Sequence, residues 1–225
     1  MHKVLAEYTL TPMKKRLASS AMMLSAFVFA PTGSVLAEND QPACGMLPSK
    51  IVEDNFYAGY GLCTLKQVRE QPLWKGLKSD GLVQQSRFTF ADGHLRWLWT
   101  IRIDERKSGA GRVEITRIGR ANGSFQRVEK KRHWHRRISK TDMTQFNQLT
   151  READLWKFEN GTWDHDEEED AIYLHCATLD MENMSSKGFR YSNVNIGCNR
   201  PVKLQAALDH VLEISNLDWE TIYDR

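Results

Sequence analysis

Four consecutive segments of alternating hydrophobic and polar residues constrain the fold of this chain most strongly. The segments span residues 82–91, 94–104, 112–120 and 124–138. Asp92-Gly93 and Asn122-Gly123 form the first and last links, and such dipeptides are preferred in two-residue hairpin turns because both central positions need positive φ. The middle link, 108–111, is longer and contains two glycines. Sequential hairpins of this kind predict a four-stranded antiparallel meander.

The alternation within these segments predicts one apolar face and one polar face. The apolar set is Phe88, Phe90, Leu95, Trp97, Trp99, Ile101, Ile103, Val113 and Ile115. The polar set is Arg87, Thr89, Arg96, Thr100, Arg102, Arg112, Glu114 and Thr116. An antiparallel sheet that is covered on one side has this pattern. We therefore expect the tryptophans in the core, with a stacking platform for a sugar or base as the alternative.

Two longer helices are predicted from apolar residues that recur every three or four positions. The first begins where Ser139, with Asp142 three residues later, gives an N-cap signal, and it ends near Trp156. The second begins at Pro201, because proline is a favoured first helical residue. Its continuous apolar stripe runs to Ile214 and predicts a helix that packs against a core.

The remaining predicted elements are shorter. They are a helix at 64–71 and two strands at 171–182 and 189–198. The order of elements predicts a single α+β domain, in which the meander is followed by a helix, two further strands and a C-terminal helix, with the helices mainly on one face. We assign residues 64–225 to this globular domain and residues 38–63 to an irregular N-terminal segment.

The first 37 residues have the composition of a secretory signal peptide. Four cations and one acid precede an apolar stretch at 17–30. Val35 and Ala37 then stand at positions −3 and −1 of a cleavage site, so cleavage is expected after Ala37. A permanent N-terminal membrane anchor is the alternative. The cleaved signal predicts a periplasmic or secreted protein.

Removal of residues 1–37 changes the charge of the chain. Four cations and one acid are lost, so the formal net charge falls from +2 to −1. Net charge therefore gives no reason to expect nucleic acid as a partner. The mature chain also contains no apolar run of about 18 residues, so no transmembrane helix is expected in it.

All four cysteines lie in the exported part of the chain. An even number of cysteines in an oxidising compartment predicts disulfides. The spacing favours Cys44–Cys63 and Cys176–Cys198, because each pair closes a short local loop. The first bridge would hold the irregular segment 38–63. A redox or nucleophilic cysteine is the alternative, although the chain contains no Cys-x-x-Cys motif.

The most unusual local composition lies in the last strand of the meander, where eight of the eleven residues 127–137 are basic or His. As a regular strand it places on one face Arg127, Glu129, Lys131, His133, His135 and Arg137. Val128 and Trp134 then both point to the core. Arginines on a polar sheet face attract phosphate or carboxylate groups and can bind them with two parallel hydrogen bonds. The predicted ligand-binding residues are Arg87, Arg96, Arg102, His133, His135 and Arg137. The alternative is an edge strand that its charges protect from aggregation.

Other kinds of site are weakly indicated. His133 and His135 could be two metal ligands, but a third ligand would have to come from elsewhere, and neighbouring cations repel a metal. The acidic run 164–170 lacks the glycine and the final glutamate of a calcium loop.

Asp180 and Glu182 are spaced as paired carboxylates on a strand. We found none of the common hydrolase, metalloprotease, phosphate-binding or dinucleotide-binding motifs. We therefore predict no metal, no cofactor and no catalytic residue.

These observations predict an exported, non-catalytic protein whose basic sheet face binds an anionic polymer of the cell envelope. Two alternatives remain open. One is a periplasmic hydrolase with a site near the loop 157–170. The other is a scaffold or interaction module that binds another envelope protein.

Overall fold

The computed structural model describes residues 42–53, 59, 61–77, 79–94, 96–121, 127–158, 176–198 and 200–223. All of them lie in the compact unit Ala37–Arg225. The predicted signal peptide, the turn at 122–123 and the acidic run 164–170 lie outside the described residues. No helix among the described residues is long and apolar enough to cross a membrane.

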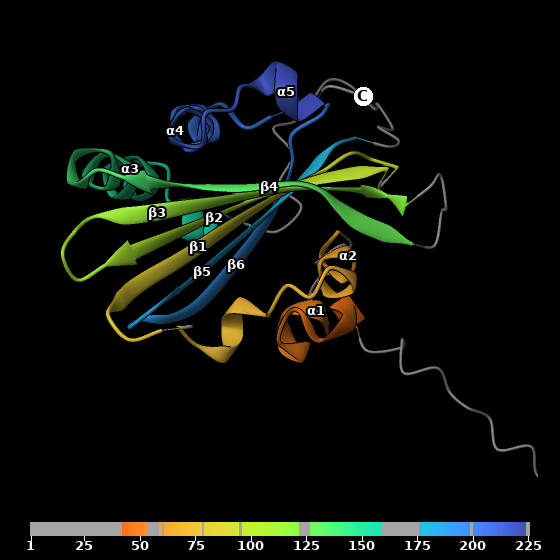
Figure 1. Cartoon of the computed structure of the whole chain (residues 1–225), viewed down its shortest axis with the longest axis horizontal. Coiled ribbons are helices and arrows are strands. Elements are labelled where there is room, and N and C mark those ends of the chain that lie inside the picture. The colour runs from red at the N-terminus through yellow and green to blue at the C-terminus, as the bar shows by residue number, and fades with distance from the viewer. Residues whose placement is uncertain are drawn as a thin grey trace, which may run out of the picture. The chain divides into compact units, whose positions relative to one another are not determined.

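A six-stranded antiparallel sheet forms the centre of the structure (Figure 1). Its strands are β1 (Leu82–Ala91), β2 (Trp97–Arg106), β3 (Gly111–Arg120), β4 (Val128–Ile138), β5 (Thr178–Ser185) and β6 (Gly188–Asn195). The strand order is β4-β3-β2-β1-β5-β6, so the predicted meander is confirmed and the β5–β6 hairpin joins it at β1. The α+β fold class is confirmed, and β4 and β6 are the two edge strands.

One face of the sheet carries three α-helices, two of which are the longest among the described residues (Figure 1). They are α3 (Lys140–Glu152), α4 (Gln205–Ser215) and α5 (Trp219–Tyr223), with the 3-10 turns η4 (Leu155–Lys157) and η5 (Val202–Leu204). The Ser139 side chain accepts a hydrogen bond from the Asp142 backbone N–H, as its N-cap position predicts. Phe88, Trp99 and Phe146 belong to the main core under these helices, so the tryptophan at 99 is a core residue.

The opposite face is covered in part by the described residues between 42 and 77, which we call the N-terminal segment from here on (Figure 1). This segment contains η1 (Pro42–Gly45), α1 (Ser49–Glu53), α2 (Leu62–Gln67) and η2 (Leu73–Lys75). Its apolar side chains form a second core with residues of β1, β2, β3 and β6: Met46, Leu47, Leu62, Leu65, Ala91, Leu98, Ile118 and Tyr191. The prediction of an open polar face is therefore wrong at the centre of the sheet, where Thr89 and Thr100 are buried.

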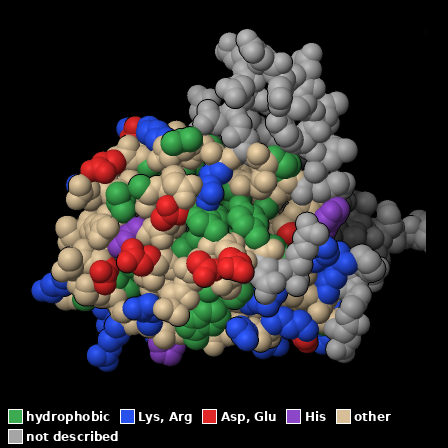
Figure 2. Space-filling view, turned by 90° about the horizontal axis from the view of Figure 1, so that it is seen from above, with side chains coloured by type: hydrophobic (Ala, Val, Ile, Leu, Met, Phe, Trp, Pro, Cys, Tyr) green, Lys and Arg blue, Asp and Glu red, His purple; other side chains and the backbone are tan. Residues whose placement is uncertain are grey.

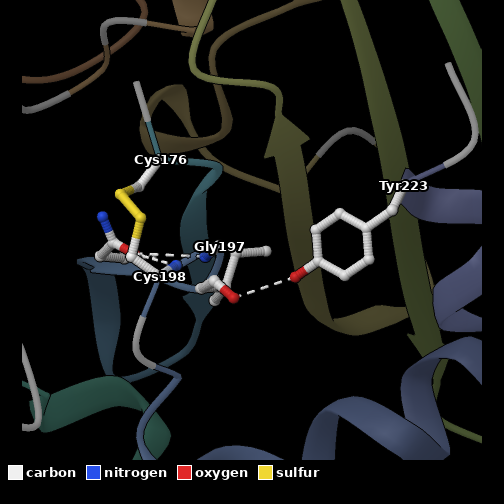
Figure 3. The surroundings of a disulfide bond; sticks show 6 residues. Cys176, Gly197, Cys198 and Tyr223 are labelled. Carbon is white, nitrogen blue, oxygen red and sulfur yellow. Dashed lines mark hydrogen bonds between the residues drawn. A yellow bond between two sulfur atoms is a disulfide. The ribbon is translucent and has the colours of Figure 1, made fainter. Parts of the chain in front are cut away.

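Two disulfides have the predicted pairing. Cys44–Cys63 joins η1 to α2, with 5.2 Å between the Cα atoms. Cys176–Cys198 joins the residues just before β5 to those just after β6, with 5.5 Å between the Cα atoms. Near this second bridge the Tyr223 hydroxyl donates to the Ile196 carbonyl at 3.0 Å, so α5 is attached to the same end of the sheet (Figure 3).

Candidate functional site

Arg87, the first of the predicted binding arginines, lies inside the protein. Its Nε donates to Glu182 Oε2 at 2.6 Å and its Nη2 to Glu182 Oε1 at 2.7 Å. Its Nη1 donates to the Gln71 carbonyl at 3.0 Å, a group of the N-terminal segment. Both side chains of this ion pair are fully buried. Arg87 therefore neutralises an internal carboxylate, and it is not exposed to a ligand.

Arg96 and Arg102 are also paired with carboxylates. Arg96 Nε lies 2.7 Å from Asp92 Oδ2, within the link between β1 and β2. Arg102 forms an ion pair with Glu114 and lies 3.4 Å from Asp104 Oδ1. Three of the six predicted site residues are thus neutralised by neighbours that the sequence pattern did not assign to them.

A β-bulge in β4 changes which of its side chains share a face. Lys130 is paired with Ile118 and Arg132 with Arg117, so Lys131 is the extra residue. Val128 consequently packs in the second core, on the same face as His133, whereas Trp134 packs on the main core. The prediction that Val128 and Trp134 point the same way is wrong. A bulge interrupts the two-residue alternation, and that alternation was the basis of the prediction.

The two histidines of β4 lie on the face that carries the N-terminal segment. His133 Nδ1 is hydrogen-bonded to Thr116 Oγ1 at 2.9 Å, and its Nε2 lies 3.4 Å from Glu114 Oε1. His135 is exposed and stands opposite Glu114 in the register with β3. Among the residues that the structure describes, no group of three or more metal-ligating side chains of the types His, Cys, Asp and Glu comes together.

The exposed cations of β4 differ from those at the centre of the sheet. Arg132, Arg136 and Arg137 are exposed, and none of them has an ion pair with another described residue. Arg137 stands opposite Arg112, whose Nε is buried without a hydrogen-bond partner among the described residues. In the view onto the helices, Lys and Arg gather mainly along the lower edge, the side to which β4 belongs (Figure 2).

Of the predicted site residues, the structure therefore places only His133, His135 and Arg137 together at the surface. Arg132 and Arg136 extend this group on the other face of β4 and were not predicted to belong to it. The signal was present in the sequence, because both arginines lie in the same basic run. We define the β4 edge cations as Arg132, Arg136 and Arg137.

The carboxylate pair suggested by spacing is also internal. Asp180 Oδ1 accepts hydrogen bonds from the Tyr191 hydroxyl at 2.5 Å and from Asn193 Nδ2 at 2.8 Å. Burial raises the pKa of Asp180 to about 6, against the lowering effect of these two hydrogen bonds. Burial and the neighbouring Asp180 raise the pKa of the Tyr191 hydroxyl. Asp180 is 1% exposed, so this acid does not face a substrate.

A polar groove of about 530 Å³ lies between α3 and the ends of β1, β5 and β6. Its lining includes Glu105, Asn147, Trp156, Asn183 and Arg190. Asn147 Nδ2 donates to Glu105 Oε2 at 3.1 Å, which holds α3 to β2. No hydroxyl or thiol in this lining is hydrogen-bonded to a histidine or carboxylate among the described residues. The loop on which the hydrolase alternative depends lies largely outside those residues.

No protein-family model matches this chain, and no relative is found among curated proteins. The function therefore has to be inferred from the arrangement of the side chains.

Proposed function

We propose that this is an exported, non-catalytic protein that binds a polyanionic partner of the cell envelope along the edge strand β4. The observation that supports this most strongly is the contrast between two sets of cations. Arg87, Arg102 and Lys130 are held by carboxylates, whereas the β4 edge cations have no acidic partner among the described residues.

Export is part of this proposal. The signal-peptide composition of residues 1–37 and the two disulfides both fit a protein of an oxidising compartment. Outside the cytoplasm, phosphorylated and sulfated or carboxylated polymers are available as partners. Nucleic acid is not the expected partner there.

The chemistry of the β4 edge cations suits such partners. Arginine is always charged and presents a planar set of donors that can bind a phosphate or carboxylate with two parallel hydrogen bonds. Because Arg132, Arg136 and Arg137 have no ion pair among the described residues, binding an anion does not require an existing salt bridge to break. Their exposure means that salt should weaken the binding strongly.

The test is the affinity of the purified chain for heparin and for lipopolysaccharide. We expect the double variant Arg136→Gln/Arg137→Gln to bind both about 30-fold more weakly, because each cation near an anionic surface contributes about 1 kcal/mol. Isothermal titration calorimetry at low salt measures this change. Thermal unfolding should be almost unaltered, since both side chains are exposed and unpaired within the described part of the chain.

The matched control is Lys50→Gln/Lys187→Gln, which removes two cations outside β4. Both lysines are exposed and have no ion pair with another described residue, and they lie in α1 and in the β5–β6 turn. Equal losses in the two double variants would show that only total charge matters and would contradict the proposal. The absence of any binding by the unaltered chain would contradict it as well.

A further inference from the structure

We propose that the anionic partner is an extended acidic polypeptide segment that pairs with the outer edge of β4 as a seventh strand of the sheet. This inference rests on the proposed function and specifies the class of partner. It is carried by the outer edge of β4, which pairs with no other strand among the described residues, by the cations on both of its faces and by the regular register of its second half.

The two edges of the sheet are not equivalent. In β4, eight of eleven residues are exposed, and β4 lies at the front of the sheet in Figure 1. In β6, five of eight residues are buried, and the Ser192 hydroxyl donates to the Leu155 carbonyl of η4 at 3.2 Å. The face of β6 is therefore packed against another element. An edge strand with no neighbour presents backbone N–H and C=O groups that can pair with an added strand.

The second half of β4 has the regularity that an added strand needs. From Arg132, paired with Arg117, to Ile138, paired with Gly111, the register with β3 is uninterrupted. The bulge at Lys131 ends this stretch on one side. Seven residues of strand span about 24 Å, which accommodates a short extended segment.

The positive charges on both faces of β4 favour an added strand over other anionic ligands. Arg132 and Arg136 point to the face of the long helices, as Trp134 between them does, and Arg137 points to the opposite face. A polysaccharide or a lipid head group needs only the charges of these cations and not their alternation between the two faces. A strand paired beside β4 places its own alternating side chains next to the cations of both faces, and opposite charges in cross-strand pairs are stabilising.

The same charges select against other strands. A second copy of β4 would bring arginine beside arginine, and like charges directly opposite one another destabilise a pair. Basic residues on edge strands therefore prevent self-association, whereas an acidic strand converts them into attractive pairs. Trp134 is half-buried against Trp99, with ring centroids 5.8 Å apart. We expect the partner to carry acidic residues on both sides of one β-branched or aromatic residue that packs next to Trp134.

The experiment uses two synthetic peptides of equal charge and the purified chain. The first is Glu-Glu-Thr-Val-Thr-Glu-Glu, in which two glutamates share the face of the central valine and two lie on the opposite face, and the second has the same sequence with every backbone amide N-methylated. We expect the first to bind at least tenfold more tightly, because N-methylation removes the backbone donors that pair with β4. Hydrogen exchange should slow at alternate amides between Arg132 and Arg137 when the first peptide binds, and the Arg136→Gln/Arg137→Gln variant should bind it more weakly.

Several results would overturn the inference. Equal affinities for the two peptides would show that backbone pairing does not occur. Binding of heparin or of anionic vesicles without binding of either peptide would assign the edge to a different class of partner, and the proposed anion-binding function would stand. If the unaltered chain bound none of these probes, both proposals would be wrong. A dimer disrupted by the Arg136→Gln/Arg137→Gln variant would assign the edge to a second copy of the chain.

Discussion

Replacement of Glu182 by Gln should lower the free energy of unfolding by about 3–5 kcal/mol, the range expected when one partner of a buried ion pair is removed. The glutamine side chain would keep the shape of the glutamate and remove its charge. Arg87 would then remain charged in a position where neither side chain of the pair is exposed. Its hydrogen bond to the Gln71 carbonyl cannot replace the lost carboxylate, because a carbonyl carries no net charge.

Equilibrium unfolding in urea measures this effect. Two controls compare it with the loss of an exposed ion pair and with the removal of both buried charges. Glu129→Gln removes a glutamate from its pair with Lys131, in which both side chains are more than 40% exposed, so its loss should cost less than about 1 kcal/mol. The double variant Arg87→Met/Glu182→Leu removes both charges and should recover most of the stability. A loss below about 1 kcal/mol for Glu182→Gln, the value typical of exposed pairs, would show that water reaches the pair, and that the N-terminal segment does not cover this face.

Asp180 should make the protein less stable as the pH rises from about 4 to about 6. The pKa of its carboxyl is about 6 in the folded chain and about 3.8 when unfolded. Between these values the folded chain holds a proton that the unfolded chain has released, so raising the pH favours unfolding. The difference between the two pKa values corresponds to about 3 kcal/mol. This cost is fully present above pH 6.

The variant Asp180→Asn should remove this dependence on pH. Its side-chain carbonyl can still accept the hydrogen bonds from Tyr191 and Asn193, and it carries no charge. The difference in unfolding free energy between the variant and the unaltered chain should therefore change by about 2 kcal/mol between pH 4 and pH 6, in favour of the variant at higher pH. Glu220→Gln, at an exposed side chain of α5, serves as the control and should show no such change. A constant difference for Asp180→Asn across this range would contradict the raised pKa.

The parts of the fold that were predictable from the sequence are those that depend on neighbouring residues. The alternation of β1 to β3 predicts the first strands of the meander, because this signal acts over a few positions. The Ser139 cap and the two disulfide loops are equally local. Each of these predictions is confirmed because no distant segment was needed to decide it. The prediction of a two-residue turn at Asp92-Gly93 is wrong, because Ala91 pairs with Leu98 and neither turn residue has positive φ.

The candidate site was only partly predictable because it depends on contacts between distant residues. Arg87 and Glu182 are 95 positions apart, so the pattern of β1 alone could not show that this arginine is neutralised. The segment around α2 buries the centre of the polar face through contacts that its own composition does not reveal. The basic residues of β4 can be recognised in the sequence, but the bulge at Lys131 cannot. The sequence therefore did not show which side chains of β4 share a face.

The central claim is that anions bind at β4 and not at the paired arginines of the sheet face. The most direct measurement is an NMR titration of the guanidinium Nε–H resonances with a heparin oligosaccharide. We predict saturable shifts for Arg132, Arg136 and Arg137, while the resonances of Arg87 and Arg102 stay in place. Saturable shifts at Arg102 with unmoved β4 resonances would contradict this account.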